Sequence, residues 1–595
     1  MLRGFRWQFL ALILAGALFS VSLLTQLRQP EPALTPTVEP AASATAILET
    51  IPPPPTSEAQ PTALPTGTLT SYREGLVGTP QRLNPLFADM NPIDQDITSL
   101  IFEGLVRTNA FGEPIPGLAE RWIVSSDGLE YVFVLRNDIL WQDGIPFSAV
   151  DVAYTMSLLR SPTFPGSVAA REFWRTIETE IIGENLIRFR LTQPLGTFLD
   201  KLQIGILPEH VLRGTTAAQL AAHPFNFTPV GTGPYQLEDI EANSDNRITQ
   251  IDLRLSFNYL QRPQVQQAQI DRVSFRFFTT FEEASAALAA DSIDGLAGTN
   301  SQQRRELFNL SNGNPSIQLY TQIEPTLGVL VFNWQRPESR FLRDQRVRVA
   351  LQTGLDRSSV IERNLPNTAV EASSPLWPSA WAYLPNLPWR AYDPNAARSE
   401  LQIVGQRLAA AQTADEDETA EITPAPEGTL FSLRVLVPED SAIVPLAQEI
   451  AAQWSQLGLN VIVEAEPLGE YRSRLEAGDF DAALVEYALG SSTDPDVYPF
   501  WHQGQIPPDG VNYGGADDRR ISELLERARR DANGLNRIDL YREFQRQFVE
   551  RAIAIPLYYP LYTYAVSNRV EGVQLGAIGS SSDRFRNIGD WRLAG

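Results

Sequence analysis

The sequence predicts an α/β protein with more than one domain, and three observations support this fold class. The chain has 595 residues, which is too long for a single hydrophobic core. Residues 431–437, 442–458 and 459–464 follow the patterns of a strand, a helix and a strand, which is the βαβ unit of a parallel sheet. Residues 118–160 combine two strands, two tight turns and a helix, which indicates a further α+β region.

The N-terminal region predicts a membrane-targeting segment followed by a tether. Arg3 and Arg6 precede an uncharged run over residues 7–27, which is the layout of a secretory signal peptide or a signal-anchor. We expect residues 1–28 to be one of these two, and the uncleaved anchor is favoured because no clear cleavage site closes the run. Residues 29–67 are rich in proline, threonine and alanine, which predicts a disordered, extended linker. In either case the rest of the chain is expected to be extracytoplasmic.

The α+β region carries the clearest local signals. Asp127 and Gly128 supply the positive φ that a hairpin turn requires. Residues 130–135 alternate between aromatic or leucine side chains and other residues at the period of a half-buried strand. Ser148, with Asp151 three residues later, predicts a helix N-cap with an acid in the first turn.

The composition excludes several classes of protein. A net charge of −23, from 48 basic and 71 acidic residues, argues against nucleic-acid binding, which needs a basic face. There is no cysteine, and the only histidines are His210, His223 and His502, so a thiolate or histidine-rich metal site is not expected. No G-x-S-x-G motif is present, which disfavours a hydrolase. We therefore expect no catalytic residues, no metal and no cofactor.

Three stretches of the chain resemble one known family. They are GLAERWIVSSDGLEYVFVLRNDILWQDGIPFSAVDV at 117–152, PVGTGPY at 229–235, and LGVLVFNWQRPESRFLRDQRVRVALQTGLDRSSVI at 327–361. Together they resemble the family 5 extracellular solute-binding proteins, the oligopeptide-, dipeptide- and nickel-binding receptors of ABC importers. The resemblance implies a two-lobed, periplasmic-binding-protein-like α/β fold with two crossing hinge segments and an extra α+β subdomain.

The resemblance also implies how the chain is divided. Lobe I is expected to be discontinuous, lobe II to carry an acidic flexible insertion, and the extra subdomain to interrupt lobe I. The expected boundaries are 68–106, 224–326 and 560–595 for lobe I, 107–223 for the subdomain, and 327–559 for lobe II with its insertion at 412–428.

Residues 486–496, EYALGSSTDPD, correspond to the ligand segment of the peptide-binding relatives. Aligned on Asp494 and the proline after it, Ser491 stands where those relatives carry an aspartate that pairs with the peptide's terminal ammonium. A serine hydroxyl cannot supply that charge-assisted bond, which weakens the inference of an ordinary peptide ligand. Glu486 is a candidate to replace the charge. Asp494 and Asp496 are expected to end the strand rather than to form a catalytic pair.

Two further stretches supply candidates. The first crossing would place Asn333 and Trp334 near the cleft mouth, where a structural role and a binding role are equally open. An aromatic-rich loop at 375–393 can line an apolar pocket, although aromatic side chains more often fill a core. The predicted ligand-binding residues are Asn333, Trp334, Trp377, Trp381, Glu486, Tyr487, Leu489, Ser491 and Tyr559.

The resemblance implies a binding function rather than a catalytic one. The chain is expected to be a monomer that captures a small solute, peptide-like or other, by hinge closure and then docks on the permease of an ABC importer. The membrane would be contacted through the N-terminal segment. The alternatives are a ligand-binding sensor that is not coupled to transport and, less favoured, an extracellular hydrolase.

Overall fold

The computed structural model describes residues 70–263, 265, 268–414, 428–489, 494–531 and 534–594. The signal segment predicted for 1–28 and the linker predicted for 29–67 lie outside the described residues.

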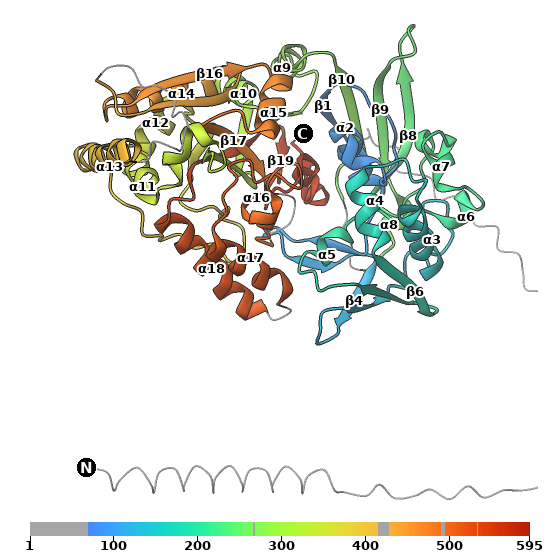
Figure 1. Ribbon diagram of the computed structural model, residues 1–595. Helices are drawn as coiled ribbons and strands as arrows, with labels where there is room; N and C mark the ends of the chain where they lie inside the picture. The colour runs from blue at the N-terminus through green and yellow to red at the C-terminus, as the bar shows by residue number, and fades with distance from the viewer. Residues whose placement is uncertain are drawn as a thin grey trace, which may run out of the picture. The chain divides into compact units, whose positions relative to one another are not determined.

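A single mixed sheet of 12 strands runs through the folded part of the chain (Figure 1). Its main path is β16-β15-β17-β13-β18-β11-β1-β10-β9-β8, and β12 and β14 pair with β18 beside this path. The bounds in path order are β16 Asn460–Glu466, β15 Ser432–Pro438, β17 Ala482–Ala488, β13 Thr326–Phe332, β18 Ala554–Ser567, β11 Gly295–Gly298, β1 Ser71–Val77, β10 Arg272–Phe278, β9 Ile248–Leu255 and β8 Tyr235–Ala242, with β12 Ile317–Ile323 and β14 Ala369–Glu371.

Strand β18 divides this sheet into two halves, which we call lobe I and lobe II. The first part of β18 pairs with β13 and β14 of lobe II. The last part of the same strand pairs with β11 and β12 of lobe I. The chain therefore passes between the lobes twice, once through the β12–β13 connection and once along β18. We call these two passages the crossing segments.

Lobe II contains the predicted βαβ unit, and this prediction is confirmed. Strands β15 and β16 pair in parallel and are joined by α14. The buried face of α14 carries Leu446, Ile450 and Trp454, which pack into a large core beneath the sheet. The lobe II helices are α11 Gln345–Thr353, α12 Arg357–Asn364, α13 Pro394–Ala414, α14 Ile443–Ser455, α15 Leu468–Ala477, α16 Tyr498–Trp501, α17 Arg519–Arg530 and α18 Gly534–Glu550.

The acidic insertion predicted at 412–428 begins inside a helix. The last residues of α13, up to Ala414, belong to it, and residues 415–427 lie outside the described residues.

Lobe I is completed by α2 (Pro92–Ile101), α9 (Phe281–Ala289) and α10 (Ser301–Gly313). A buried polar network ties the C-terminal segment to this lobe. The guanidinium of Arg584 donates from Nε to Glu74 (2.8 Å) and from Nη2 to Asp96 (2.7 Å). Tyr72 and Tyr564 donate their hydroxyls to the same Glu74 carboxylate. Every one of these side chains is buried.

A separate four-stranded sheet, in the order β4-β5-β7-β6, forms the α+β subdomain. The predicted hairpin is confirmed, because Gly128 has a φ of 70° in the turn between β4 and β5. The predicted helix start is confirmed as well, since Ser148 and Asp151 form a capping box at α3. The bounds are β4 Ala119–Val124, β5 Glu130–Leu135, β6 Ile177–Gly183, β7 Leu186–Leu191, α3 Ala149–Arg160 and α4 Val168–Arg175.

The remaining elements are short. They are β2 Val106–Thr108, β3 Pro114–Pro116, α5 Phe198–Lys201, α6 Glu209–Leu212, α7 Ala217–Leu220, α8 Phe257–Leu260, β19 Val570–Glu571 and β20 Arg592–Leu593. Six 3-10 turns accompany them: Ala88–Met90, Pro224–Phe227, Pro337–Arg343, Gln503–Gln505, Ser581–Phe585 and Ile588–Asp590.

Candidate functional site

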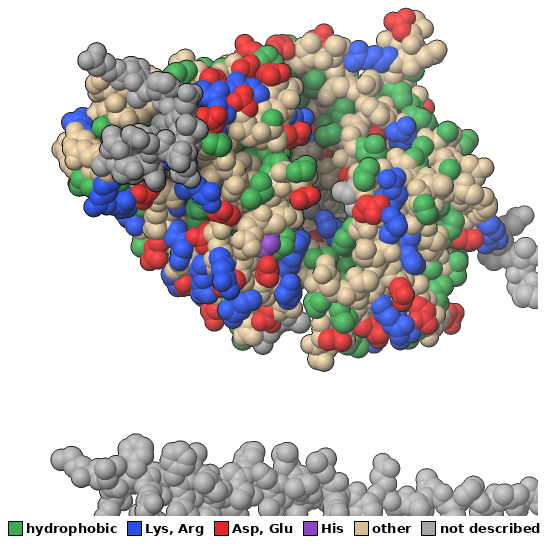
Figure 2. Space-filling model, in the orientation of Figure 1, with side chains coloured by type: hydrophobic (Ala, Val, Ile, Leu, Met, Phe, Trp, Pro, Cys, Tyr) green, Lys and Arg blue, Asp and Glu red, His purple; other side chains and the backbone are tan. Residues whose placement is uncertain are grey.

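The two crossing segments lie side by side. Glu324 stands between β12 and β13, and its backbone N–H donates to the carbonyl of Pro560 on β18 (2.9 Å). The surface is hollowed between the part that carries α15 and α16 and the part that carries α2 and α4 (Figure 2). Two lobes joined by a pair of adjacent strands are the arrangement expected of a hinge.

A carboxylate and a phenol meet beside this hinge. Glu486 on β17, Gly328 on β13 and Tyr558 on β18 are partners across three neighbouring strands. Since Gly328 has no side chain, the buried Tyr558 reaches across it and donates its hydroxyl to Oε1 of Glu486 (2.8 Å). Burial and the nearby Glu486 carboxylate hold the pKa of Tyr558 well above its usual range. The Glu486 side chain is exposed, so its remaining acceptor positions are open to a solute.

An ion pair from lobe I stands next to Glu486. Arg304 on α10 donates to Glu324 at 2.7 Å, and both side chains are largely buried. Burial raises the pKa of Glu324 despite the Arg304 guanidinium, and the Glu486 carboxylate raises it further. Arg304 therefore pairs with Glu324, while Glu486 lies close enough for its charge to act on that pair. Such a group can accept hydrogen bonds from, or neutralise, a cationic part of a ligand.

Asn333 and Trp334, which were predicted near the cleft mouth, follow the end of β13 away from the crossing, and both are buried and have partners. Asn333 donates to the carbonyls of Gly478 (2.9 Å) and Phe480 (3.0 Å) and accepts from two backbone N–H groups. Trp334 lies under the guanidinium of Arg348, with 3.8 Å between the guanidinium carbon and the ring centre. Both side chains thus hold the end of β13 in place.

The predicted aromatic residues are divided between the core and its margin. Trp377 and Tyr559 are almost fully buried, and the Tyr559 hydroxyl donates to the carbonyl of Ser374 (2.7 Å). Tyr487 is also buried and donates to the carbonyl of Val511 (2.9 Å). Trp381 is only partly buried and packs edge-on against Tyr541.

The ligand segment itself is described only in part. Leu489 is buried, and its backbone N–H donates to the carbonyl of Pro325 in the first crossing (2.7 Å). Ser491 lies outside the described residues. Asp494 forms a bidentate ion pair with Arg537, and Asp496 contacts Arg529 at 3.0 Å. Each carboxylate is bound to a guanidinium. The prediction that these two residues end the strand is wrong, because β17 already ends at Ala488.

Sequence reasoning missed Tyr558, Arg304 and Glu324. Tyr558 and Tyr559 are consecutive on β18, so their side chains point to opposite faces of the sheet. The register of Tyr558 with Glu486 depends on pairing between distant strands. The one available signal was Gly328 in an otherwise apolar strand, since a glycine there often marks a close approach.

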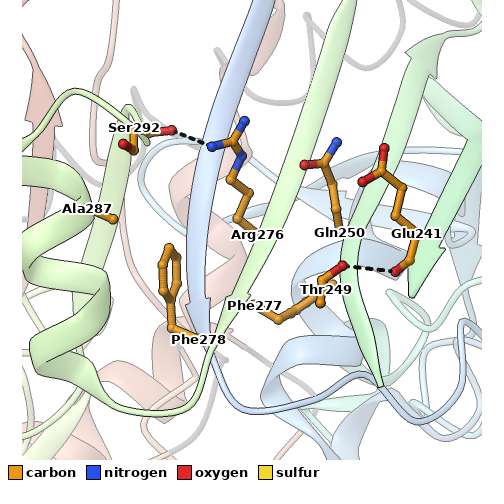
Figure 3. A pocket seen from close by; sticks show the side chains of 8 residues that line it. All are labelled: Glu241, Thr249, Gln250, Arg276, Phe277, Phe278, Ala287 and Ser292. Carbon is orange, nitrogen blue, oxygen red and sulfur yellow. Dashed lines mark hydrogen bonds between the residues drawn. The ribbon is translucent and has the colours of Figure 1, made fainter. Parts of the chain in front are cut away.

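A separate pocket of about 350 Å³ lies on lobe I, away from the crossing segments (Figure 3). It is lined by side chains from β8, β9, β10 and α9, including Glu241, Gln250, Arg276 and Phe278. Nη1 of Arg276 donates to the carbonyl of Ser292 (3.0 Å) at its edge. Neighbouring acidic and basic groups give this pocket no excess charge of one sign.

None of the helices described is long and apolar enough to cross a membrane. No group of three or more histidine or carboxylate side chains in the described ranges is placed to hold a metal ion.

Known proteins share both the sequence pattern and the fold. The dipeptide-binding protein of Escherichia coli is 23% identical over 531 residues, which cover 86% of this chain and 93% of that protein. The oligopeptide-binding protein AppA of Bacillus subtilis is 25% identical over 533 residues, covering 87% and 91%. The crystal structure of NikZ from Campylobacter jejuni with Ni(L-His) matches with a TM-score of 0.64 at 24% identity, covering 88% and 99%.

These similarities confirm the predicted two-lobed fold. The family profile described as bacterial extracellular solute-binding proteins, family 5 middle, matches residues 113–507. Proteins of this family are extracytoplasmic and act by binding. The chain belongs to the family 5 bacterial extracellular solute-binding proteins.

Proposed function

We propose that this chain is the substrate-binding subunit of an ABC importer, which traps a peptide-like solute between its lobes by hinge closure and leaves the solute chemically unchanged. The dipeptide- and oligopeptide-binding relatives support the ligand class. The paired crossing segments support the hinge, because two adjacent strands allow rotation of one lobe on the other. Closure would follow from contacts that the solute makes with both lobes at once.

The observation that carries this proposal is the exposed Glu486 carboxylate held by Tyr558 beside the crossing segments. Ser491 cannot supply a charge to a ligand ammonium, whereas Glu486 can. The Arg304–Glu324 pair next to it neutralises only one of the two carboxylates. A solute with a free amine therefore fits this site better than a neutral or anionic one.

The predicted site residues take two roles in this proposal. Glu486, Ser491 and Trp381 would contact the solute from lobe II. Buried residues would shape the wall behind them, since their polar atoms are engaged within the protein. These supporting residues are Asn333, Trp334, Trp377, Tyr487, Leu489 and Tyr559.

The N-terminal region would keep the receptor beside its permease. Residues 1–28 would act as an uncleaved anchor, and residues 29–67 as the tether. Mass spectrometry of the mature protein checks this part, because an anchored chain retains residues 1–28, whereas a cleaved one begins after them. The rest of the proposal does not depend on the result.

Ligand binding is best tested by thermal shift, because a ligand that binds only the folded form raises the melting temperature. Di- and tripeptides with free amines should stabilise the chain that begins at residue 68, and their N-acetylated counterparts should not. Glu486→Gln should lower the affinity by about 1.5–3 kcal/mol, the usual worth of a hydrogen bond to a charged group.

Glu362→Gln is the matched control, since Glu362 is exposed on α12 of the same lobe. Equal binding of free and acetylated peptides, or an unchanged affinity of Glu486→Gln, would contradict the assignment of Glu486. Recovery of a cleaved peptide after incubation would contradict a pure binding function.

A further inference from the structure

A loop of the α+β subdomain rests on lobe II. The loop follows β7, and Gly196 in it lies directly against the guanidinium of Arg537 on α18. A β-carbon added to Gly196 would stand 2.3 Å from Nη1 of Arg537 and 2.5 Å from its Cζ. Distances this short do not occur between unbonded atoms, so the contact in this arrangement requires glycine.

The guanidinium of Arg537 is held in place and cannot move to accommodate a β-carbon at position 196. Its two terminal nitrogens donate to Asp494, at 2.7 Å from Nη1 and 2.8 Å from Nη2. Its Nε donates to the carbonyl of Ala528 (2.9 Å). The ring centres of Trp381 and Tyr541 lie 5.1 and 5.7 Å from its central carbon. The Arg537 side chain is only 9% exposed, so it forms a fixed platform.

This platform is joined to the ligand segment. Asp494, which holds Arg537, lies near the C-terminal end of that segment at 486–496. Nearer its other end, Leu489 is bonded to the carbonyl of Pro325 in the first crossing. The described ends of the segment therefore contact the hinge at Leu489 and the surface on which the opposite lobe rests at Asp494.

A second contact between the lobes lies next to the hinge. Arg305 on α10 donates to the hydroxyl of Ser441 before α14 (3.0 Å). The neighbouring Arg304 pairs with Glu324 in the crossing, so a rotation about the crossing segments would move this contact less than a contact made by the subdomain. Gly196 belongs to the subdomain, outside the central sheet, so a rotation about the crossing segments would separate it from Arg537.

We propose that Gly196 and Arg537 form a closure latch: the Gly196 loop seats on the Arg537–Asp494 pair when the lobes meet, which couples lobe closure to the position of the ligand segment. Arg537 is a positioning residue in this latch and does not touch the solute. The proposal rests on hinge closure as proposed above, but it does not depend on which solute is bound.

The test measures the distance between the lobes directly. Because the chain contains no cysteine, Glu184→Cys and Arg519→Cys place two nitroxide labels at exposed positions with no background labelling. Double electron–electron resonance on the full chain then reports how often the lobes are together. Gly196→Ala should lower the fraction at the short distance by about five-fold or more, as expected from the cost of overpacking a fixed site.

Two further variants make the result decisive. Gly469→Ala is the matched control, because a β-carbon there meets no atom within 4 Å, and it should leave the distances unchanged. In the background Asp494→Asn with Arg537→Gln, the shorter and unpinned side chain should remove most of the Gly196→Ala effect. If that double variant does not fold, Gly196→Ala and its control still decide the question.

The outcomes separate the latch from the proposed function. Unchanged distances in Gly196→Ala, or an equal shift in the double-variant background, would overturn the latch, and peptide binding by thermal shift would still stand. A shift confined to Gly196→Ala supports the latch even if none of the tested peptides binds.

Discussion

Glu486 and Tyr558 lie on strands that are not neighbours, yet their side chains meet because Gly328 on the strand between them has no side chain. A β-carbon on Gly328 would stand 2.3 Å from the Tyr558 ring. The exposed Glu486 carboxylate, which we propose binds the solute, is thus oriented by a buried phenol across a glycine. Two predictions concern this arrangement, a third concerns the buried network in lobe I, and a fourth concerns the ion pairs of Asp479 in lobe II.

Gly328→Ala should displace the Tyr558 ring and separate its hydroxyl from Glu486. Because the ring is buried and packed, we expect a loss of about 1–3 kcal/mol in the free energy of unfolding. Urea denaturation measures this loss, and the thermal shift with free-amine peptides should shrink in parallel. Gly469→Ala, which meets open space, is the control and should change neither quantity.

Tyr558→Phe removes the hydroxyl and keeps the ring. The free energy of unfolding should fall by about 1 kcal/mol, the net worth of one hydrogen bond. Ligand affinity should fall as well, since the Glu486 carboxylate loses the group that orients it. A variant that keeps full affinity at reduced stability would show that Tyr558 serves the fold alone.

Arg584→Met should be the most destabilising of these changes. It leaves Glu74 and Asp96 buried without their shared cation, which costs about 3–5 kcal/mol when one partner of a buried ion pair is removed. The midpoint of urea unfolding should move accordingly. Arg592→Gln breaks an exposed pair with Glu571 and should change stability by less than about 1 kcal/mol.

The ionisation of Asp479 makes the free energy of unfolding depend on pH in the acidic range. Hydrogen bonds from Arg434 and Arg336 lower the pKa of Asp479 to about 2, below the value of about 3.9 expected in the unfolded chain. Because the pKa of Asp479 is lower in the folded state, its ionised carboxylate stabilises the folded state above pH 4. This contribution to the free energy of unfolding is lost as the pH falls from about 4 to 2.

Urea unfolding of the parent chain and of Asp479→Asn at several pH values measures this effect. The parent should be more stable at pH 6, and the difference should shrink towards pH 2. The gap should stay within about 1 kcal/mol because Asp479 is 48% exposed and solvent screens the pair. A gap that is constant with pH would contradict the assignment.

The sequence predicted those elements that depend on residues close together in the chain. The Asp127-Gly128 turn, the Ser148 cap and the β15–α14–β16 unit each depend on residues close together in the chain. Each of these features was therefore predictable without knowledge of distant partners.

The candidate site was predicted only in part, because it depends on the register between remote strands. Glu486 was identified from its position in the ligand segment, but its partner Tyr558 lies 72 residues away. The neighbouring Tyr559 points into the core on the opposite face. Asn333 looked available from the sequence because nothing local shows that Gly478 and Phe480 would bind its amide.

The 14 residues of β18 also bear on how this protein is made. Since that strand completes both half-sheets and begins at Ala554, neither lobe can close its sheet until the ribosome has delivered almost the whole chain. A nascent chain that stays incomplete for so long remains a substrate for export in the unfolded state. Truncation before Ala554 would leave the edges of β13 and β11 unpaired, and such fragments are candidates for aggregation and proteolysis.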